Sequence, residues 1–537
     1  MIRPPANGPK HLPETVVDFG HRHPALMSGA FLVAAQAIMC IGLWNGGVPL
    51  GDEGVHIIRA LSVGWSPRTW TSPFHDVYAL VLVLLRDPVS AHLAYRFFLA
   101  ETTALVLWRI LHCTGFSLRS SVGASILWIG CGLGNTLVQF GNINLFAFSV
   151  AGVGISLVLT KPTTARRAIC IGLLLMASGS RVEYLAPAGL LLLVEVVRYA
   201  RRATPRKRVV FIGMTVACIF AAVASVDTRF FDGYLLLGLG QCYAHFVHRQ
   251  NPGLTFNPFT EYGPLLDSVF GSPKTFAAAV LHNPRELARY FALNGLRNAA
   301  MVVPSMLNPR RIVKLSSITI QGLVPLIVVW AGIATGLALA IRRARQFATP
   351  WGKVGYLSVL ASSASVSILL HIPDPRYWIG SVPIVYAGVA IALEALLQLS
   401  LPRWLRTATI FGALAWLLWP MPWSQLDNQP AIRAARAALV GRNQPTFVGT
   451  FPEPWVAFVR RGEARAEGIE RIARNPDWSL EGIDLVIVDD SLQQSRIWKE
   501  NAPKFAVLES PQFQCVFRQG TLALFVSQRS RAESTTR

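Results

Sequence analysis

Apolar residues are grouped along this chain in long blocks, with polar and charged residues gathered between the blocks. Several blocks hold about twenty residues, which is the length of helix that crosses about 30 Å of hydrocarbon. The fold class that this pattern favours is an α-helical polytopic membrane protein. About eleven membrane-spanning helices are predicted, over 26–45, 88–112, 120–138, 143–160, 168–181, 183–197, 209–226, 317–341, 353–370, 378–398 and 404–420.

The composition agrees with that fold class. The 537 residues are 52% hydrophobic and only 15% charged, whereas a soluble domain carries about 25% charged residues. A soluble enzyme, a disordered chain and a disulfide-rich scaffold are therefore excluded. Of the seven cysteines, Cys242 and Cys515 lie in long polar segments and could pair in an oxidising compartment, although spacing alone does not establish a bridge.

The distribution of charge predicts the topology. Lys and Arg outnumber Asp and Glu by 50 to 29, which gives a net charge of +21. Alternate connections between the predicted spans, taken together with the basic residues at the span ends beside them, hold 17 Lys and Arg residues, and the connections contain no Asp or Glu. Because short cytoplasmic loops collect basic residues, these connections are expected in the cytoplasm, with the N-terminus inside and the C-terminus outside. The basic loop at 198–208 is expected to bind anionic membrane lipids, not nucleic acid.

This topology predicts a multi-pass protein of the cell (inner) membrane in three parts. They are a cytoplasmic tail over 1–25, a transmembrane domain over 26–420 and an extracytoplasmic, or periplasmic, soluble domain over 421–537. Two long outer loops interrupt the transmembrane domain, at 46–87 and 227–316. The first contains Val77–Leu85, an apolar stretch too short to span, which we interpret as an interfacial or half-embedded helix.

The C-terminal segment alternates between strand-like and helix-like stretches. Strands are predicted at Thr446–Gly449, Ile483–Val488, Lys504–Leu508 and Thr521–Val526. Helices are predicted at Pro430–Val440, Pro454–Arg460 and Leu492–Lys499. Such alternation is typical of a small α/β domain.

Polar residues in or beside the spans gather at the outer face. They are Asp52, Glu53, Arg96, Gln139, Asn142, Asn144, Arg181, Glu183, His371, Asp374, Arg376 and Tyr377. Ionisable groups at membrane depth are expensive, so they are candidates for function. Arginine suits phosphate oxygens, and a nearby carboxylate can act as a base. The combination points to group transfer from a lipid-linked phosphate at the outer surface, with arginines stabilising charge on the leaving phosphate.

These residues also carry a family resemblance. The arrangement resembles the GT-C superfamily of integral-membrane glycosyltransferases, which use polyprenyl-phosphate-linked sugars, and is closest to the branch of protein O-mannosyltransferases and aminoarabinose transferases. The segments that resemble the family are Gly51-Asp52-Glu53-Gly54, Ser72-Pro73-Phe74-His75, Arg96, Gly141-Asn142-Ile143-Asn144, Arg181-Val182-Glu183 and Arg376-Tyr377 with Pro383. The turn at Ser72 departs from the family by lacking its His-Pro-Pro.

The resemblance implies an inverting transfer in which Asp52 is the general base that deprotonates the acceptor hydroxyl. Glu53 would hold the acceptor or a neighbouring arginine. Arg376 is the first candidate for the donor phosphate. Further candidates for the phosphate are Arg181, Arg96, His371 and Tyr377, and those for the acceptor or other polar contacts are His75, Asn142 and Glu183. The resemblance specifies neither the sugar nor the acceptor, which could be a lipid, a glycan or a protein. The resemblance implies no certain cofactor. Whether Asp52 and Glu53 bind a divalent metal ion stays open.

Each of these assignments has a structural alternative. Asp52 and Glu53 could instead be a charge pair at a helix N-terminus. Arg181 could pair with Glu183 to shape its turn, and Arg376 could pair with Asp374. At the level of the whole protein, the alternatives are a transporter or flippase of lipid-linked or small solutes, and a non-catalytic assembly scaffold.

Two further motifs are open to a functional and a structural interpretation. Cys242, His245 and His248 recur every three residues and could bind zinc, although aromatic packing at the membrane interface fits the segment better. Asp489 and Asp490 follow a predicted strand, where α/β folds place sites, although an acidic pair there is more often a helix N-cap.

Overall fold

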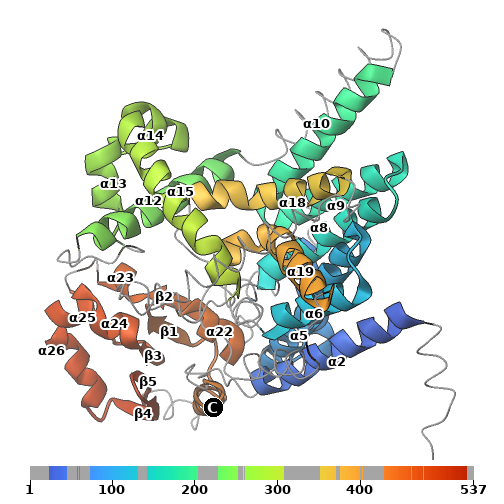
Figure 1. The fold of residues 1–537 in the computed structure, drawn as a ribbon. Coiled ribbons are helices and arrows are strands. Elements are labelled where there is room, and N and C mark those ends of the chain that lie inside the picture. The colour runs from blue at the N-terminus through green and yellow to red at the C-terminus, as the bar shows by residue number, and fades with distance from the viewer. Residues whose placement is uncertain are drawn as a thin grey trace, which may run out of the picture.

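The computed structural model describes part of the chain. The described residues are 23–44, 57, 60, 73–130, 142–202, 228–251, 258, 261–307, 351–370, 375–398, 402, 428–450, 452–460, 463–473, 475 and 477–528. They form a mostly helical region followed by a C-terminal α/β sheet (Figure 1). Three predicted spans, 209–226, 317–341 and 404–420, lie outside the described residues.

Helices occupy the other predicted spans. They are α2 (Pro24–Trp44), α5 (Pro88–Thr114), α6 (Leu118–Gly130), α8 (Asn142–Thr160), α9 (Thr164–Ser180), α10 (Leu185–Arg202), α18 (Trp351–Leu370) and α19 (Val382–Gln398). Among the described helices, one window, Ile143–Thr160 in α8, is long and apolar enough by itself to cross a membrane. The helical character of these segments is confirmed, and the number of crossings stays a prediction.

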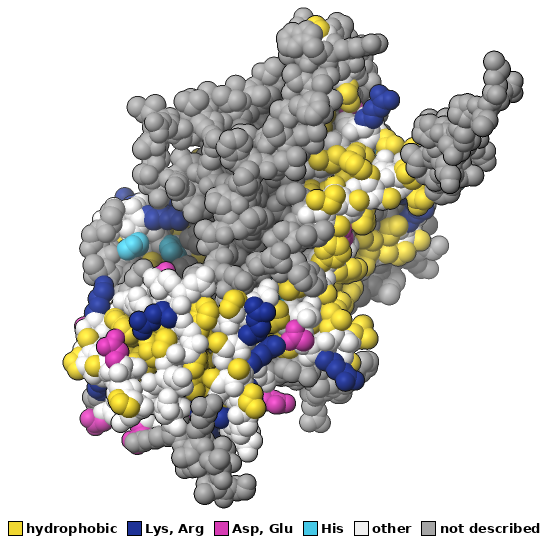
Figure 2. Space-filling model, turned by 90° about the horizontal axis from the view of Figure 1, so that it is seen from below, with side chains coloured by type: hydrophobic (Ala, Val, Ile, Leu, Met, Phe, Trp, Pro, Cys, Tyr) yellow, Lys and Arg dark blue, Asp and Glu magenta, His cyan; other side chains and the backbone are white. Residues whose placement is uncertain are grey.

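Large apolar side chains lie on the outside of this helical region. Phe31 and Ile38 on α2 are 55% and 68% exposed, and Leu193 on α10 is 57% exposed. Figure 2 shows such side chains gathered along one side of the molecule. Monomeric soluble proteins rarely expose extended apolar surface, which normally marks contact with a membrane or another protein. The surface therefore agrees with the predicted membrane location.

The short helix expected in the first outer loop is present as α4 (Pro73–Leu85). One face, with Phe74, His75, Tyr78 and Leu82, is buried. The opposite face exposes apolar side chains, with Val83 71% exposed. A helix of 13 residues with this division can lie partly in an apolar layer, but it is too short to cross one.

Contacts between helix ends agree with the predicted alternation. Lys353, at the start of α18, donates a hydrogen bond of 2.8 Å to the carbonyl oxygen of Cys113, at the end of α5. Arg167, at the start of α9, pairs with Glu195 near the end of α10 at 2.8 Å. The charge pattern assigns all four of these positions to the cytoplasmic side.

Close helix packing depends on a glycine in α8. A Cβ atom at Gly154 would lie 3.2 Å from the Cα atom of Cys170 and 3.3 Å from the Cβ atom of Leu173, both in α9. Small residues at such contacts let the backbones of membrane helices approach one another. Gly172, in α9, has open space where its side chain would be.

We expect Gly154→Leu to lower the free energy of unfolding by about 1–3 kcal/mol, because the side chain overpacks the contact with α9. Thermal unfolding in detergent measures the effect. Gly172→Leu is the matched control and should leave the midpoint nearly unchanged. Equal midpoints for both variants would contradict the close packing of α8 on α9.

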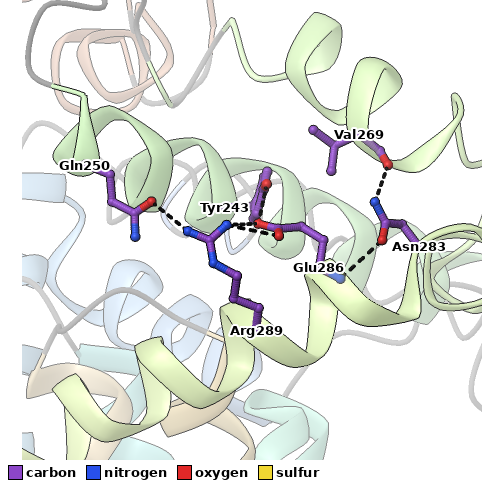
Figure 3. A network of polar contacts seen from close by, with 6 residues as sticks. All are labelled: Tyr243, Gln250, Val269, Asn283, Glu286 and Arg289. Atoms are coloured by element: carbon purple, nitrogen blue, oxygen red, sulfur yellow. Dashed lines mark hydrogen bonds and ion pairs between the residues drawn. The ribbon is translucent and has the colours of Figure 1, made fainter.

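The second outer loop contains four described helices: α12 (Thr228–Gln250), α13 (Gly263–Phe270), α14 (Phe276–His282) and α15 (Pro284–Leu307). They share an aromatic core in which Tyr243 packs edge-on against Tyr290 and Phe270, with ring centroids 5.5 and 5.2 Å apart. The Tyr243 hydroxyl donates to Glu286 at 2.9 Å, and Glu286 also pairs with Arg289 (Figure 3). This network joins α12 to α15.

The C-terminal domain is a five-stranded mixed sheet. Its strands are β1 (Thr446–Gly449), β2 (Arg465–Gly468), β3 (Leu485–Val488), β4 (Phe513–Gln519) and β5 (Leu522–Ser527), in the order β2-β1-β3-β5-β4. β1 is parallel to β2 and β3, whereas β5 is antiparallel to β3 and β4. Its helices are α21 (Gln429–Ala438), α22 (Glu453–Arg460), α23 (Ile469–Ile472), α24 (Asp490–Gln494), α25 (Arg496–Glu500) and α26 (Ala502–Phe505).

The predicted α/β character of this domain is confirmed, but one of the four predicted strands is wrong. Lys504–Leu508 is helical, in the end of α26 and in the 3-10 helix η3 (Ala506–Glu509). Pro503, near the start of α26, favours a helix start. Phe505 and Leu508 are both buried three positions apart, which is a helical spacing. β2 and β4, which have few buried residues, were not predicted.

Candidate functional site

Several predicted site residues lie outside the described residues, namely Asp52, Glu53, Gln139, His371 and Asp374. The backbone of three others is placed. Arg376 and Tyr377 belong to the 3-10 helix η2 (Pro375–Ser381), and Asn142 is the first residue of α8. The side chains of these three lie outside the described part of the structure.

The first turn of α4 contacts three segments that the sequence assigns to the outer face, in α5, α8 and α9. The backbone amide of Phe74 donates to the hydroxyl of Ser180, at the end of α9, at 3.4 Å. Its carbonyl oxygen accepts a hydrogen bond of 3.3 Å from the hydroxyl of Tyr95 in α5. Its ring packs edge-on against that of Phe146, near the start of α8, at 5.8 Å. The structure therefore brings together segments that the charge pattern assigns to the outer face.

The turn that follows α9 carries an ion pair. Arg181 Nη2 lies 2.5 Å from Glu183 Oε1, and the two side chains are only 15% and 8% exposed. Glu183 belongs to the 3-10 helix η1 (Val182–Tyr184). The pair supports the structural interpretation of Arg181, because it neutralises two charges and fixes their turn.

Three more candidate residues are buried near these contacts. His75 follows Phe74 and is 6% exposed, and their rings pack edge-on at 5.3 Å. Arg96, which follows Tyr95 in α5, is 3% exposed, and Asn144 in α8 is 4% exposed. Polar groups at this depth normally have hydrogen-bond partners. The structure therefore places His75, Arg96 and Asn144 inside the helical region, beside or near the contacts of Phe74.

Two further buried ionisable residues in α5, His92 and Glu101, were not identified from the sequence. His92 in α5 is fully buried, and its Nδ1 atom lies 2.9 Å from the hydroxyl of Tyr78 in α4. Glu101, further along α5, is also buried, and its oxygens have no hydrogen-bond partner among the described residues. Both are ionisable residues inside a predicted span, which was the available signal.

The Cys242, His245 and His248 motif lies on α12. Among the described residues, no group of three His, Cys, Asp or Glu side chains is placed to hold a metal ion. Burial, with Arg249 and His248 nearby, lowers the pKa of His245 to about 4, so its imidazole is neutral at pH 7. Cys242 is buried in the aromatic core of α12–α15 and forms no disulfide. These contacts support aromatic packing.

The remaining candidates in the C-terminal domain are structural. Asp489 is the N-cap of α24, and its Oδ1 atom accepts from the amide of Leu492 at 2.8 Å. The helix-cap interpretation of the acidic pair is therefore confirmed for Asp489. Cys515 in β4 is exposed and free, so it forms no bridge with Cys242.

The chain has little similarity to known proteins. No family model matches it, and no curated protein matches it. Among solved structures, it is similar to ArnT from Cupriavidus metallidurans in the apo state, with 13% sequence identity and a TM-score of 0.38, over 94% of this chain and 99% of that chain. A likeness at this level shows neither a shared family nor a shared activity.

Proposed function

We propose that this protein is an integral-membrane glycosyltransferase. It moves a sugar from a polyprenyl-phosphate carrier to a lipid, glycan or protein acceptor on the extracytoplasmic side of the membrane. Asp52 is the general base, and Arg376 is the first ligand of the donor phosphate. Arg181, Arg96, His371 and Tyr377 support the phosphate, and the acceptor is held by Glu53, His75, Asn142 and Glu183.

One observation carries this proposal. The start of α4, the outer part of α5 and the end of α9, which are far apart in the sequence, meet through Phe74, Tyr95 and Ser180. Arg181, Glu183, His75 and Arg96 are each next to one of these contacts or within three residues of it. A cluster of basic and acidic groups at the edge of a membrane region can bind an anionic headgroup and still supply a base.

The proposed step is a direct displacement. Asp52 takes the proton of the acceptor hydroxyl as its oxygen attacks the anomeric carbon of the sugar. The bond between that carbon and the phosphate oxygen breaks, and its electron pair leaves with the polyprenyl phosphate. Attack opposite the leaving group inverts the configuration. The arginines stabilise the charge that grows on the phosphate.

The test is to supply labelled lipid-linked sugars to the purified protein in detergent. We expect polyprenyl phosphate to be released, together with a labelled product of inverted anomeric configuration. The same donors in proteoliposomes address the alternatives. Movement of an intact donor across the membrane without cleavage would indicate a transporter or flippase and overturn the proposal. If no donor is either cleaved or moved across the membrane, the result would favour a scaffold.

A further inference from the structure

The C-terminal domain packs directly on the helical region. One contiguous hydrophobic core includes Leu99 and Leu107 of α5, together with Ile432 of α21 and Trp455 of α22. Figure 1 shows α22 on the side of the sheet that faces the helices, with α23–α26 on the other side. The domain is therefore fixed against the helices by packing, and its orientation can affect them.

Arg436, on α21, makes a polar contact across this interface. Its Nη2 atom lies 3.0 Å from Asp87 Oδ1, in the corner between α4 and α5. Its Nε and Nη2 atoms also donate to the carbonyl oxygen of Phe458, at the end of α22, at 3.0 and 2.5 Å. One guanidinium therefore joins α21, α22 and the α4–α5 corner. The planar fork of arginine suits such a three-way contact better than lysine.

Asp87 has a second role at the same corner. As the N-cap of α5, it accepts hydrogen bonds of 2.8 Å from both the amide and the hydroxyl of Ser90. Burial raises the pKa of this carboxyl, but the Ser90 hydrogen bonds and Arg436 outweigh that effect and lower it below its usual value. Asp87 is therefore charged at neutral pH, and its charge faces Arg436.

A chain of contacts leads from Arg436 to the first turn of α4. The ring of Phe458 packs edge-on against that of His92 in α5, at 5.8 Å. His92 binds the hydroxyl of Tyr78 in α4 at 2.9 Å. The Tyr78 ring then packs against that of Phe74, at 5.8 Å. Phe74 is the residue that contacts α5, α8 and α9, and it precedes His75.

We propose that the C-terminal domain positions α4 for the reaction and that Arg436 is the positioning residue through which it does so. The inference rests on the proposed function. Arg436 acts through Asp87, Phe458 and α4, and not by touching a reacting group. Side chains of both Arg436 and Asp87 are about one-third exposed, 34% and 37%. Such a pair contributes little to global stability, so removing it alters position rather than folding.

The test compares Arg436→Gln with Arg433→Gln, an exposed arginine one turn earlier on α21. We expect Arg436→Gln to lower kcat about ten-fold or more, because small misplacements of reacting groups have large effects on rate. KM for the lipid-linked donor should change less than about two-fold. Asp87→Asn, which keeps an oxygen for the Ser90 cap, should act in the same direction. Arg433→Gln should leave both constants unchanged.

Hydrogen exchange provides a readout that does not depend on activity. Arg436→Gln should speed amide exchange in 76–85 of α4 while β1 and β3 keep their protection. Unchanged exchange in α4 would overturn the positioning role, whether or not the protein transfers sugar. Faster exchange with unchanged kcat would overturn the link to the reaction. If the wild-type protein cleaves no donor, the proposed function fails, and exchange still decides whether Arg436 positions α4.

Discussion

Asp52→Asn is expected to bind donor normally and to lose about 100-fold to 10,000-fold in turnover, the range that general-base catalysis contributes. Asparagine has nearly the shape of aspartate, but its amide cannot take the proton of the acceptor hydroxyl. The measurement is the initial rate of release of polyprenyl phosphate from a labelled donor, with donor binding measured separately. A transporter or a scaffold would tolerate the change.

The matched control for this variant is Asp267→Asn. Asp267 is an exposed carboxylate on α13 in the second outer loop, so the control removes one negative charge from a segment assigned to the same side. It should keep full turnover. Full turnover by Asp52→Asn as well would place the base elsewhere, and loss of donor binding would assign Asp52 to the binding of substrate instead.

The second large effect is expected at the Arg181–Glu183 pair. Removing one partner of a mostly buried ion pair leaves the other charge without compensation, at a cost of about 3 kcal/mol or more. Arg181→Gln and Glu183→Gln should therefore each lower the free energy of unfolding by about that amount. The double variant should recover most of the loss, because no single charge is left. Unfolding in detergent, analysed as a double-mutant cycle, measures the coupling.

The double variant also separates the two roles of Arg181. If Arg181 only shapes its turn, the stable double variant should have a normal KM for the donor. If it also binds the donor phosphate, KM should rise while stability recovers. Arg285→Gln, an exposed change on α15, is the control for charge alone. Single variants as stable as the wild type would show that the pair does not hold the turn.

Much of the helical region follows from the sequence, because the membrane makes local hydrophobicity decisive. Blocks such as 143–160 must form helices to satisfy their backbone, and α8 begins within one residue of the predicted start. The C-terminal domain is less predictable. Lys504–Leu508 has a strand-like composition, but Asn501, Pro503 and the spacing of its buried residues favour a helix. Local composition alone does not separate these outcomes.

The site could be predicted only as a set of segments. Charge placed Arg96 and Arg181 at the outer face, and the structure places their segments around Phe74. The pairing of Arg181 with Glu183 is one of the two interpretations that the sequence allows, because the two residues are close in sequence. The contact of Asp87 with Arg436 was not, because the residues are far apart along the chain and each is an ordinary surface charge. Such a contact depends on how the folded C-terminal domain packs against the helical region.

The hydrophobic core shared by the helical region and the C-terminal domain has a consequence for the expression of isolated fragments. A fragment that starts near Asn428 keeps α21 and α22 over its sheet, but it exposes to water the side of these helices that packs on α5, including the ring of Phe458. Apolar residues presented in this way promote aggregation. The isolated tail is therefore a poor choice for expression, whereas a full-length preparation keeps that surface covered.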